Sequence, residues 1–297
     1  MIAFLADLHL TSRTPPCRID KEPFKVVQKK KLTKAAEKMI DLGVTDVLVA
    51  GDIFHTPRDL ESMETLMDII VKFDDDLRWH GISGQHDMYY RNSNSATSLA
   101  IMFKHGYIAK LGKIGRKLGE AIVYGCSFGE EVPVPKNMND FNVLVIHESI
   151  SDHEAFGHIS KYNATAFLRN HPQYNLIVCG DIHATFKTEI KGGIIANPGP
   201  LFRSDASEYN FSHRPGFFTF DGETLKFEEV EHEPAENVMY RDYIDSRIKA
   251  QRKESSFVSI LQNAKLGRVN PMEAVLDFFK DDELAQQLIF QAKSKVK

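Results

Sequence analysis

The chain has 297 residues, 42% of them hydrophobic and 26% charged, which suits one large globular domain with a smaller appendage. Its formal net charge of −4 excludes a protein that is basic throughout, so contact with a nucleic acid would have to come from local patches. The three cysteines lack paired spacing, and no stretch approaches the roughly 18 apolar residues of a membrane span. We therefore expect a cytoplasmic protein with reduced thiols and no membrane segment.

Short apolar runs alternate with amphipathic stretches in the first part of the chain. The runs are continuously apolar, which is typical of strands covered on both faces. Helices are predicted near 31–43 and 60–73, where apolar residues recur at helical spacing. This alternation predicts a layered α/β domain. The predicted strands are 2–6, 47–50, 122–124, 143–146 and 176–179.

The pattern changes after about residue 200. Segment 216–230 alternates in polarity around an Asp-Gly turn, which predicts an edge hairpin of the same domain. The sequence then becomes helical and charged, with apolar stripes at 257–264 and 272–289 that either pack on the core or bind a partner. The predicted division is a main domain at 1–238 and a helical C-terminal region at 239–297.

Potential metal ligands follow the apolar runs in five clusters. Two of them, in "VLVAGDIFH" and "LIVCGDIHATF", are nearly copies of one another, although they lie more than a hundred residues apart. Each cluster alone is weak evidence, because a histidine or a Gly-Asp after a strand is commonly part of a turn. Functional groups collect beyond the carboxyl ends of strands in α/β sheets, so five clusters in series favour one metal site with the two copies as its walls. The clusters supply Asp7, His9, Asp52, His55, Gln85, His86, His147, Asp181 and His183.

The order of "ADLH", "AGDIFH", "SGQHD", "IHES" and "CGDIH" resembles the signature of the calcineurin-like metallophosphoesterase superfamily over roughly residues 1–225. The form "GDIFH", followed by "GQHD" and "NPGPLFR", is most similar to SbcD-type DNA-repair nucleases, in particular the compact phage-encoded subunits of recombination endonucleases. The resemblance implies a layered β-sandwich flanked by helices and a centre of two Mn²⁺ ions, with Mg²⁺ possible. A phage-encoded member would act in the host cytoplasm.

The resemblance also implies a role for each matching residue. His86 would donate a proton to the departing 3′-oxygen, and His55 would position the phosphate or that donor. Asp52 would bridge the two cations. The first cation would be held by Asp7, His9, Asp52 and His183, and the second by Asp52, Gln85, His147 and Asp181.

Two residues depart from the family pattern at the second cation. Gln85 stands where Asn is usual, and Asp181 stands where His is usual. The three carboxylates of Asp7, Asp52 and Asp181 leave a charge of +1 with two divalent ions, against +2 with the usual two carboxylates. One hypothesis is that the site favours Mn²⁺ or Mg²⁺ over Zn²⁺. The other is a weakened second site, filled only when substrate is present.

Basic residues support a DNA substrate rather than a small phosphodiester. The strip "KLGKIGRKLG" contains several of them, and others follow the "GQHD" and "NPGP" segments. The alternative interpretation of the strip is a solvated basic loop. The candidate DNA contacts are Arg91, Asn92, Lys113, Arg116, Lys117 and Arg203.

SbcD-type nucleases act with an SbcC-type ATPase whose coiled coil is gripped by C-terminal helices, and the two apolar stripes resemble such a grip. The resemblance further implies a homodimer through helices such as 60–73 and 92–105. We expect the DNA-capping domain of larger members to be absent, with only the short hairpin near 216–230 remaining. The sequence thus predicts a Mn²⁺-dependent DNA exo- or endonuclease subunit. The alternatives are a small-molecule phosphodiesterase and a catalytically weak scaffold for the ATPase.

Overall fold

The computed structural model describes residues 1–89, 96–152, 160–205 and 207–246, together with Lys249, Asn270, Val275 and Phe279. The chain divides into a unit at Met1–Tyr240 and a unit at Arg241–Lys297. Apart from Val275 and Phe279, the predicted C-terminal stripes lie outside the described residues, as do the candidates Arg91 and Asn92. No helix in these described ranges is long and apolar enough to cross a membrane.

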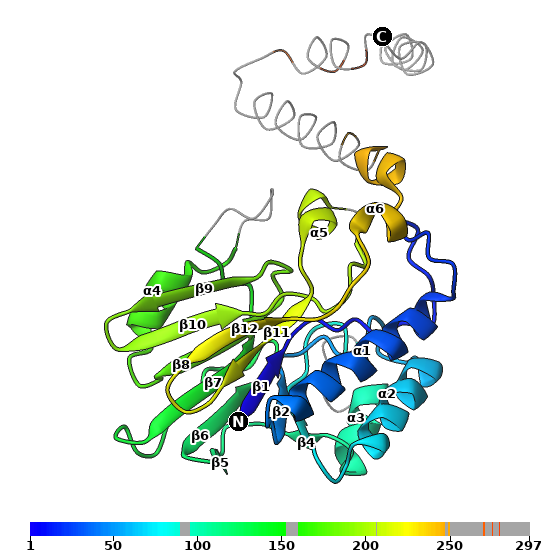
Figure 1. Cartoon of the computed structure of the whole chain (residues 1–297). Coiled ribbons are helices and arrows are strands. Elements are labelled where there is room, and N and C mark those ends of the chain that lie inside the picture. The colour runs from blue at the N-terminus through cyan, green and yellow to red at the C-terminus, as the bar shows by residue number, and fades with distance from the viewer. Residues whose placement is uncertain are drawn as a thin grey trace. The chain divides into compact units, whose positions relative to one another are not determined.

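The first unit contains two six-stranded mixed sheets (Figure 1). Strands β1 to β4 run parallel in the first sheet, and β6, β7, β8 and β10 run parallel in the second. The first sheet has the order β12 (Leu225–Glu229), β11 (Gly216–Phe220), β1 (Ile2–Leu5), β2 (Asp46–Val49), β3 (Arg78–Gly81) and β4 (Ala109–Lys110). The second has the order β5 (Arg116–Leu118), β6 (Ala121–Cys126), β7 (Phe141–His147), β8 (Leu176–Gly180), β10 (Gly193–Asn197) and β9 (Phe186–Ile190).

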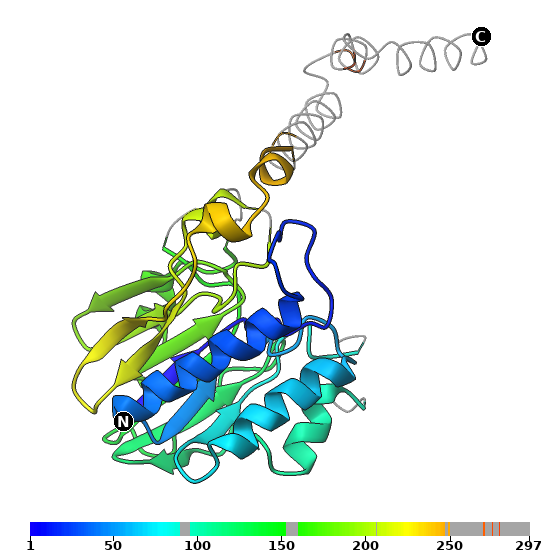
Figure 2. The ribbon, with the colours of Figure 1, turned by 45° about the vertical axis from the view of Figure 1, so that its right-hand side comes forward.

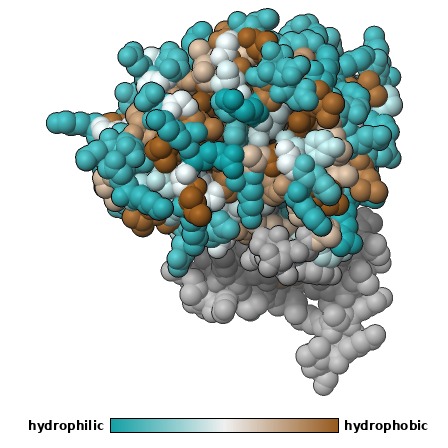
Figure 3. Space-filling view, turned by 90° about the horizontal axis from the view of Figure 1, so that it is seen from below, coloured by the Kyte–Doolittle hydropathy of each residue, from teal (hydrophilic) through white to brown (hydrophobic). Residues whose placement is uncertain are grey.

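Helices cover the outer faces of both sheets (Figures 1 and 2). The first sheet carries α1 (Phe24–Asp41), α2 (Leu60–Lys72) and α3 (Ser98–Lys104), and the second carries α4 (Ala164–Asn170). Two short helices, α5 (Glu208–Ser212) and α6 (Ala235–Val238), follow the second sheet along the chain. Figure 3 shows the end of the molecule where the parallel strands begin, and hydrophilic side chains cover most of it, with scattered apolar patches.

Three apolar clusters fill the spaces between these layers. Side chains alternate along β1, so that Ala3 and Leu5 pack toward α1, α2 and α3 while Ile2 and Phe4 face the second sheet. A third cluster, which includes Leu144 of β7, lies between the second sheet and α4. The order helix, sheet, sheet, helix confirms the predicted layered fold.

The predicted elements agree with the structure in type and differ at their ends. All five predicted strands are present, and β11 and β12 form the expected edge hairpin beside β1. Helix α1 begins at Phe24, earlier than the predicted start at residue 31, because Phe24 and Gln28 extend its buried face by two turns. The strands that were not predicted are β3, β4, β5, β9 and β10.

Candidate metal centre

The nine candidate residues lie together where parallel strands of both sheets end. Asp7 and His9 follow β1, Asp52 and His55 follow β2, and Gln85 and His86 come after β3. The second sheet contributes the last residue of β7, His147, and the residues Asp181 and His183 that follow β8. The two Gly-Asp-Ile segments therefore stand in different sheets and face one another across one site, as the sequence predicts.

Asp52 lies at the middle of the cluster. Its Oδ2 is 3.6 Å from Nε2 of His9 and 3.4 Å from Nε2 of His147, while its Oδ1 accepts a 2.8 Å hydrogen bond from the backbone N–H of His86. One carboxylate oxygen is thus fixed by the backbone, and the other points between two imidazoles. This is the position that a bridging ligand requires.

The first predicted ligand group contains two converging histidines. Nε2 of His9 lies 3.1 Å from Nε2 of His183. Ligand atoms of Asp7, His9 and His183 all lie within 4.8 Å of one another, so one cation can contact all three. Nδ1 of His183 lies 3.3 Å from Oδ2 of Asp205, which leaves Nε2 for a ligand role.

The second predicted group is built around His147. Its Nδ1 donates to the backbone oxygen of Ala50 at 2.7 Å, so Nε2 is the nitrogen that would bind a metal after losing its proton. Gln85 donates from Nε2 to Oδ1 of Asp181 at 2.6 Å, and this turns its carbonyl oxygen into the site. The longer Gln85 side chain is therefore accommodated by a bond to the other departing residue, Asp181.

The backbone is strained where the ligands lie. In the described part of the chain, the non-glycine residues with positive φ are Asp7 (50°), His9 (42°), Asp52 (46°) and Asp181 (88°), and all are candidate ligands. Such conformations cost on the order of 1–3 kcal/mol each and persist where surrounding structure enforces them. Among the described non-glycine residues, left-handed backbone is thus confined to candidate ligand positions.

Glycines allow the two walls to approach. A Cβ atom on Gly51 would lie 2.4 Å from Nδ1 of His147, and one on Gly84 would lie 2.1 Å from Oδ1 of Asp52. A Cβ atom on Gly180 would lie 2.4 Å from the backbone oxygen of Ala50. The glycines of the motifs are therefore required by packing against the ligands.

The buried carboxylates and imidazoles of the site shift the pKa values of one another. Burial raises the pKa of Asp7 to about 6. Burial would also raise the pKa of Asp52, but the neighbouring His147 and His9 outweigh it and lower that pKa. Burial would lower the pKa of His147, but Asp52 and Asp7 raise it to about 10. Without cations, protons on the histidines thus balance the carboxylates, and metal binding would release them.

Orphaned polar atoms show that these residues fit a metal centre. Among the described residues, Nδ1 of His9, Oδ2 of Asp52, Oε1 of Gln85 and Nε2 of His147 are buried and have no hydrogen-bond partner. Buried polar atoms are normally paired, so each of these is costly in the protein alone. Three of them are atoms that the ligand assignment uses, and mixed oxygen and imidazole donors suit Mn²⁺, Fe²⁺ or Zn²⁺.

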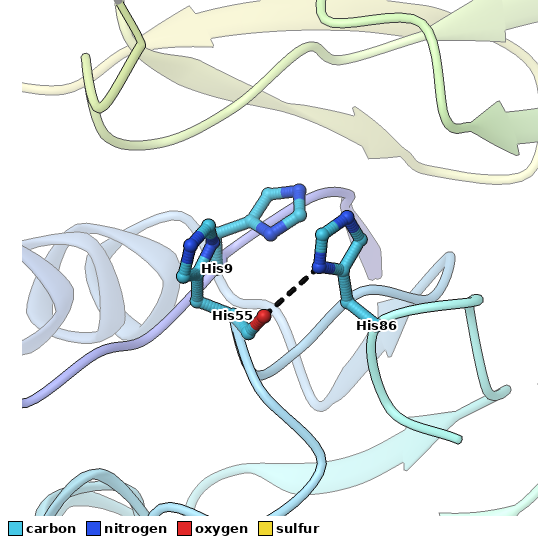
Figure 4. A group of neighbouring side chains, drawn as sticks. All are labelled: His9, His55 and His86. Atoms are coloured by element: carbon cyan, nitrogen blue, oxygen red, sulfur yellow. Dashed lines mark hydrogen bonds between the residues drawn. The ribbon is translucent and has the colours of Figure 1, made fainter. Parts of the chain in front are cut away.

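His55 and His86 lie on the exposed side of the cluster, next to the buried His9 (Figure 4). Nδ1 of His86 donates to the backbone oxygen of His55 at 2.9 Å, and the two rings stack with centroids 5.4 Å apart. Burial and the neighbouring His86 lower the pKa of His55. The His86 ring is therefore held by its Nδ1, and its Nε2 is the nitrogen available for proton exchange.

The basic candidates occupy different environments. Lys113, Arg116 and Lys117 are exposed, but Arg116 and Lys117 pair with the first half of β6, away from the strand end that bears the site. Arg203 is 5% exposed, and its guanidinium donates to the backbone oxygens of His213 and Glu233. These bonds hold loops together, and the contact of Arg203 with DNA stays a prediction.

Two carboxylates near the site were given no role from the sequence. Asp205 orients His183, as described above, and the buried Asp87 accepts hydrogen bonds from the backbone N–H groups of Ile53, Phe54 and Gly84. Burial and the charge of Asp52 raise the pKa of Asp87 to about 7. Asp87 belongs to the "GQHD" motif, whereas Asp205 follows no strand and had no signal in the sequence.

A family model and several solved structures are similar to this chain. Residues 1–212 match the calcineurin-like phosphoesterase superfamily domain. No curated protein matches the chain. Similar solved structures include TT1561 of Thermus thermophilus, with 10% identity over 77% of this chain and 98% of that chain and a TM-score of 0.47.

Two further solved structures have comparable similarity. A novel archaeal phosphodiesterase shares 13% identity over 77% of this chain and 99% of its own, with a TM-score of 0.40. A putative 5′-nucleotidase from Staphylococcus aureus shares 12% identity over 84% of this chain and 58% of its own, with a TM-score of 0.45. Similarities at this level are too distant to transfer a substrate.

Proposed function

Because the chain belongs to the calcineurin-like phosphoesterase superfamily, we propose that it is a metal-dependent nuclease that hydrolyses phosphodiester bonds in DNA. The observation that carries the proposal is the anchored His86 beside the candidate ligands, on the exposed side of the cluster. A proton donor there is accessible to a long substrate. The "GDIFH", "GQHD" and "NPGPLFR" segments support the nuclease branch by resemblance.

The residues of both sheets would hold two divalent cations. Asp7, His9 and His183 suit one cation, and His147, Gln85 and Asp181 suit the other, with Oδ2 of Asp52 between them. Two bound cations would supply an activated water and stabilise negative charge on the phosphate.

His86 would protonate the leaving oxygen from Nε2. The carbonyl of His55 holds Nδ1, so the proton that His86 exchanges with substrate resides on Nε2. General acid catalysis of this kind contributes roughly 10²–10⁴-fold. His55 contributes through its backbone, which any residue at position 55 retains.

We propose that the cations are Mn²⁺, with Mg²⁺ possible. The additional carboxylate of Asp181 and the amide of Gln85 enrich the second position in oxygen donors, which harder cations prefer. The Asp181→His variant is expected to raise the affinity for Zn²⁺, measured by competitive titration of Zn²⁺ against Mn²⁺. Unchanged metal preference would contradict this assignment and favour a weakly occupied second position.

A partner ATPase and a homodimer are part of the same proposal. The apolar stripes at 257–264 and 272–289 would grip the coiled coil of an SbcC-type ATPase, and deletion of 250–297 should abolish co-purification with it.

Helix α2 leaves Leu60 and Val71 69% and 55% exposed, which supports its use in a dimer. Sedimentation of the Val71→Glu variant tests that contact.

The function is tested with labelled linear and single-stranded DNA in Mn²⁺, beside the small diester bis(p-nitrophenyl) phosphate. We expect cleavage of DNA, loss of it in His86→Ala, and near wild-type rates in His55→Ala because the carbonyl remains. Cleavage of the small diester alone would indicate a small-molecule phosphodiesterase. Inactivity toward every substrate with the ATPase present would indicate a scaffold.

A further inference from the structure

A cationic cleft separate from the metal centre lies at the start of α1. The loop Arg18–Glu22, the α1 residues Lys31 and Lys34, and the segment Glu231–Val238 form its walls around a volume of about 660 Å³. Six cationic side chains and four carboxylates line it, which leaves a net charge of +2 (six minus four) with His232 neutral. The name α1 cleft is used below for this space.

Most of the carboxylates in the α1 cleft are already paired. Asp20 binds Arg18 at 2.5 Å, Glu22 binds Lys30 at 2.6 Å and Glu231 binds Lys34 at 2.8 Å. The fourth carboxylate, Glu233, is exposed. These pairs neutralise one another and leave the positive charge of Lys31, Arg203 and the exposed Lys21.

Among the described residues, Lys31 forms no ion pair with a carboxylate, although it is half-buried and lines the α1 cleft together with Arg18 and Arg203. Burial, followed by the charges of Arg18 and Arg203, lowers the pKa of Lys31 to about 7. A lysine in such surroundings is stabilised by an anion that it can contact. The need for a counter-ion therefore comes from the side chains themselves.

The two guanidinium groups retain donors that face no protein acceptor in the described part of the chain. Each has five N–H groups. Arg18 uses three of them, on Asp20 and on the backbone oxygen of Arg203. Arg203 uses three on the backbone oxygens of His213 and Glu233. Planar guanidinium groups with free N–H pairs, beside an ammonium, match the oxygens of a phosphate.

We propose that the α1 cleft binds a phosphate-class anion, held by Lys31 with Arg18 and Arg203. The site is connected to the metal centre along the chain, since Arg203 lies two residues before Asp205, which orients His183. The anion is either a free phosphate or a backbone phosphate of the DNA. The second source rests on the proposed nuclease function, and the first does not.

Binding is tested by calorimetric titration of inorganic phosphate into the full chain in Mg²⁺. We expect the wild type to show one more binding event than Lys31→Gln, or at least about 10-fold tighter binding. Lys31→Arg should restore it. Lys29→Gln is the matched control, because Lys29 lies on α1 outside the α1 cleft and is paired with Asp68 at 2.6 Å.

Identical isotherms for the wild type and Lys31→Gln, with both proteins folded by circular dichroism, would overturn the site. Equal binding of acetate at the same ionic strength would overturn its phosphate character. A single-stranded oligonucleotide added to the His86→Ala protein separates the two sources. Displacement of the bound phosphate supports a DNA phosphate, and its persistence supports a free phosphate. DNA cleavage is measured separately, so either proposal can fail alone.

Discussion

The two Gly-Asp-Ile segments share a sequence and a strained aspartate, but they deliver their histidines to different places. Asp52 and Asp181 both have positive φ. His183 follows Asp181 by two residues and converges on His9, whereas His55 follows Asp52 by three and is exposed. The additional residue is Phe54, which is fully buried and pairs with Leu10. With this additional buried residue, His55 lies on the exposed side of the site, where its backbone oxygen accepts a hydrogen bond from Nδ1 of His86.

The aspartates of the two segments also differ in burial. The Asp52 side chain is 1% exposed and lies between His9 and His147, whereas that of Asp181 is 20% exposed and bonds to Gln85. If this difference decides their roles, Asp52→Asn should reduce kcat/KM by on the order of 10³-fold. Asp181→Asn should reduce it by roughly 10- to 100-fold. Hydrolysis in saturating Mn²⁺ measures both, and equal losses would show that the segments contribute alike.

The histidine of the second segment depends on a partner that the first lacks. Asp205 lies 3.3 Å from Nδ1 of His183 and fixes the ring. Asp205→Asn is expected to weaken Mn²⁺ binding by roughly 10- to 100-fold. The measurement is the Mn²⁺ concentration that gives half-maximal binding in calorimetry. Glu223→Gln, at an exposed turn, should leave it unchanged, and an unaltered value in Asp205→Asn would remove Asp205 from the site.

Gly51, the glycine of the first segment, is expected to be sensitive to substitution because His147 of the second sheet packs against it. Gly51 (φ +83°) and Gly43 (φ +78°) have similar backbones, but only a Cβ atom on Gly51 would meet a neighbour, His147. Ala at either position has to adopt a left-handed backbone, at about 1–2 kcal/mol. Gly51→Ala should lose about 1–3 kcal/mol more of the free energy of unfolding than Gly43→Ala, measured in urea. Equal losses of unfolding free energy in the two variants would mean that His147 can move away from residue 51 at no cost.

The strand before the first segment begins with a buried charge, whereas the strand before the second begins with Leu176. Burial would raise the pKa of Asp46, but hydrogen bonds from His80 and Arg78 outweigh it and lower the pKa. A lowered pKa means that Asp46 stabilises the fold above its ordinary pKa of about 4, and that this contribution is lost as the pH falls below it.

Asp46→Asn tests that difference. We expect it to reduce the free energy of unfolding by roughly 1–3 kcal/mol at pH 7, because His80 and Arg78 lose a charged partner. The gap between variant and wild type should narrow between pH 5 and pH 3. A gap that is constant over this range would mean that the charge of Asp46 does not matter. The Leu176 strand offers no such pH dependence.

The clustering of most candidate ligands could be predicted because these residues closely follow apolar strands. Parallel strands that end at one edge bring such residues together without any knowledge of loop geometry, so Asp7, Asp52 and His147 could be placed from local patterns alone. The hairpin of β11 and β12 could likewise be predicted from the residues of that segment alone. These predictions needed only the period of the apolar residues and the turn between them.

Features that depend on distant contacts could not be predicted. The bonds of the buried Arg203 to the backbone oxygens of His213 and Glu233 have no signal in the sequence around it. Asp205 acquires its role from His183, with no pattern around it. The pairing of β1 with β11 joins residues more than two hundred positions apart, and nothing in either strand specifies the other.

That pairing has a consequence for how the protein folds. β1 lies inside its sheet between β2 and β11, yet β11 is synthesised long after it. Until residues 216–220 emerge, one edge of the strand that leads to Asp7 and His9 has unpaired N–H and C=O groups. Contacts of such high sequence separation slow folding. During translation the nascent chain would therefore expose an adhesive strand edge, and chaperone binding there should matter more than for a protein whose first strand pairs locally.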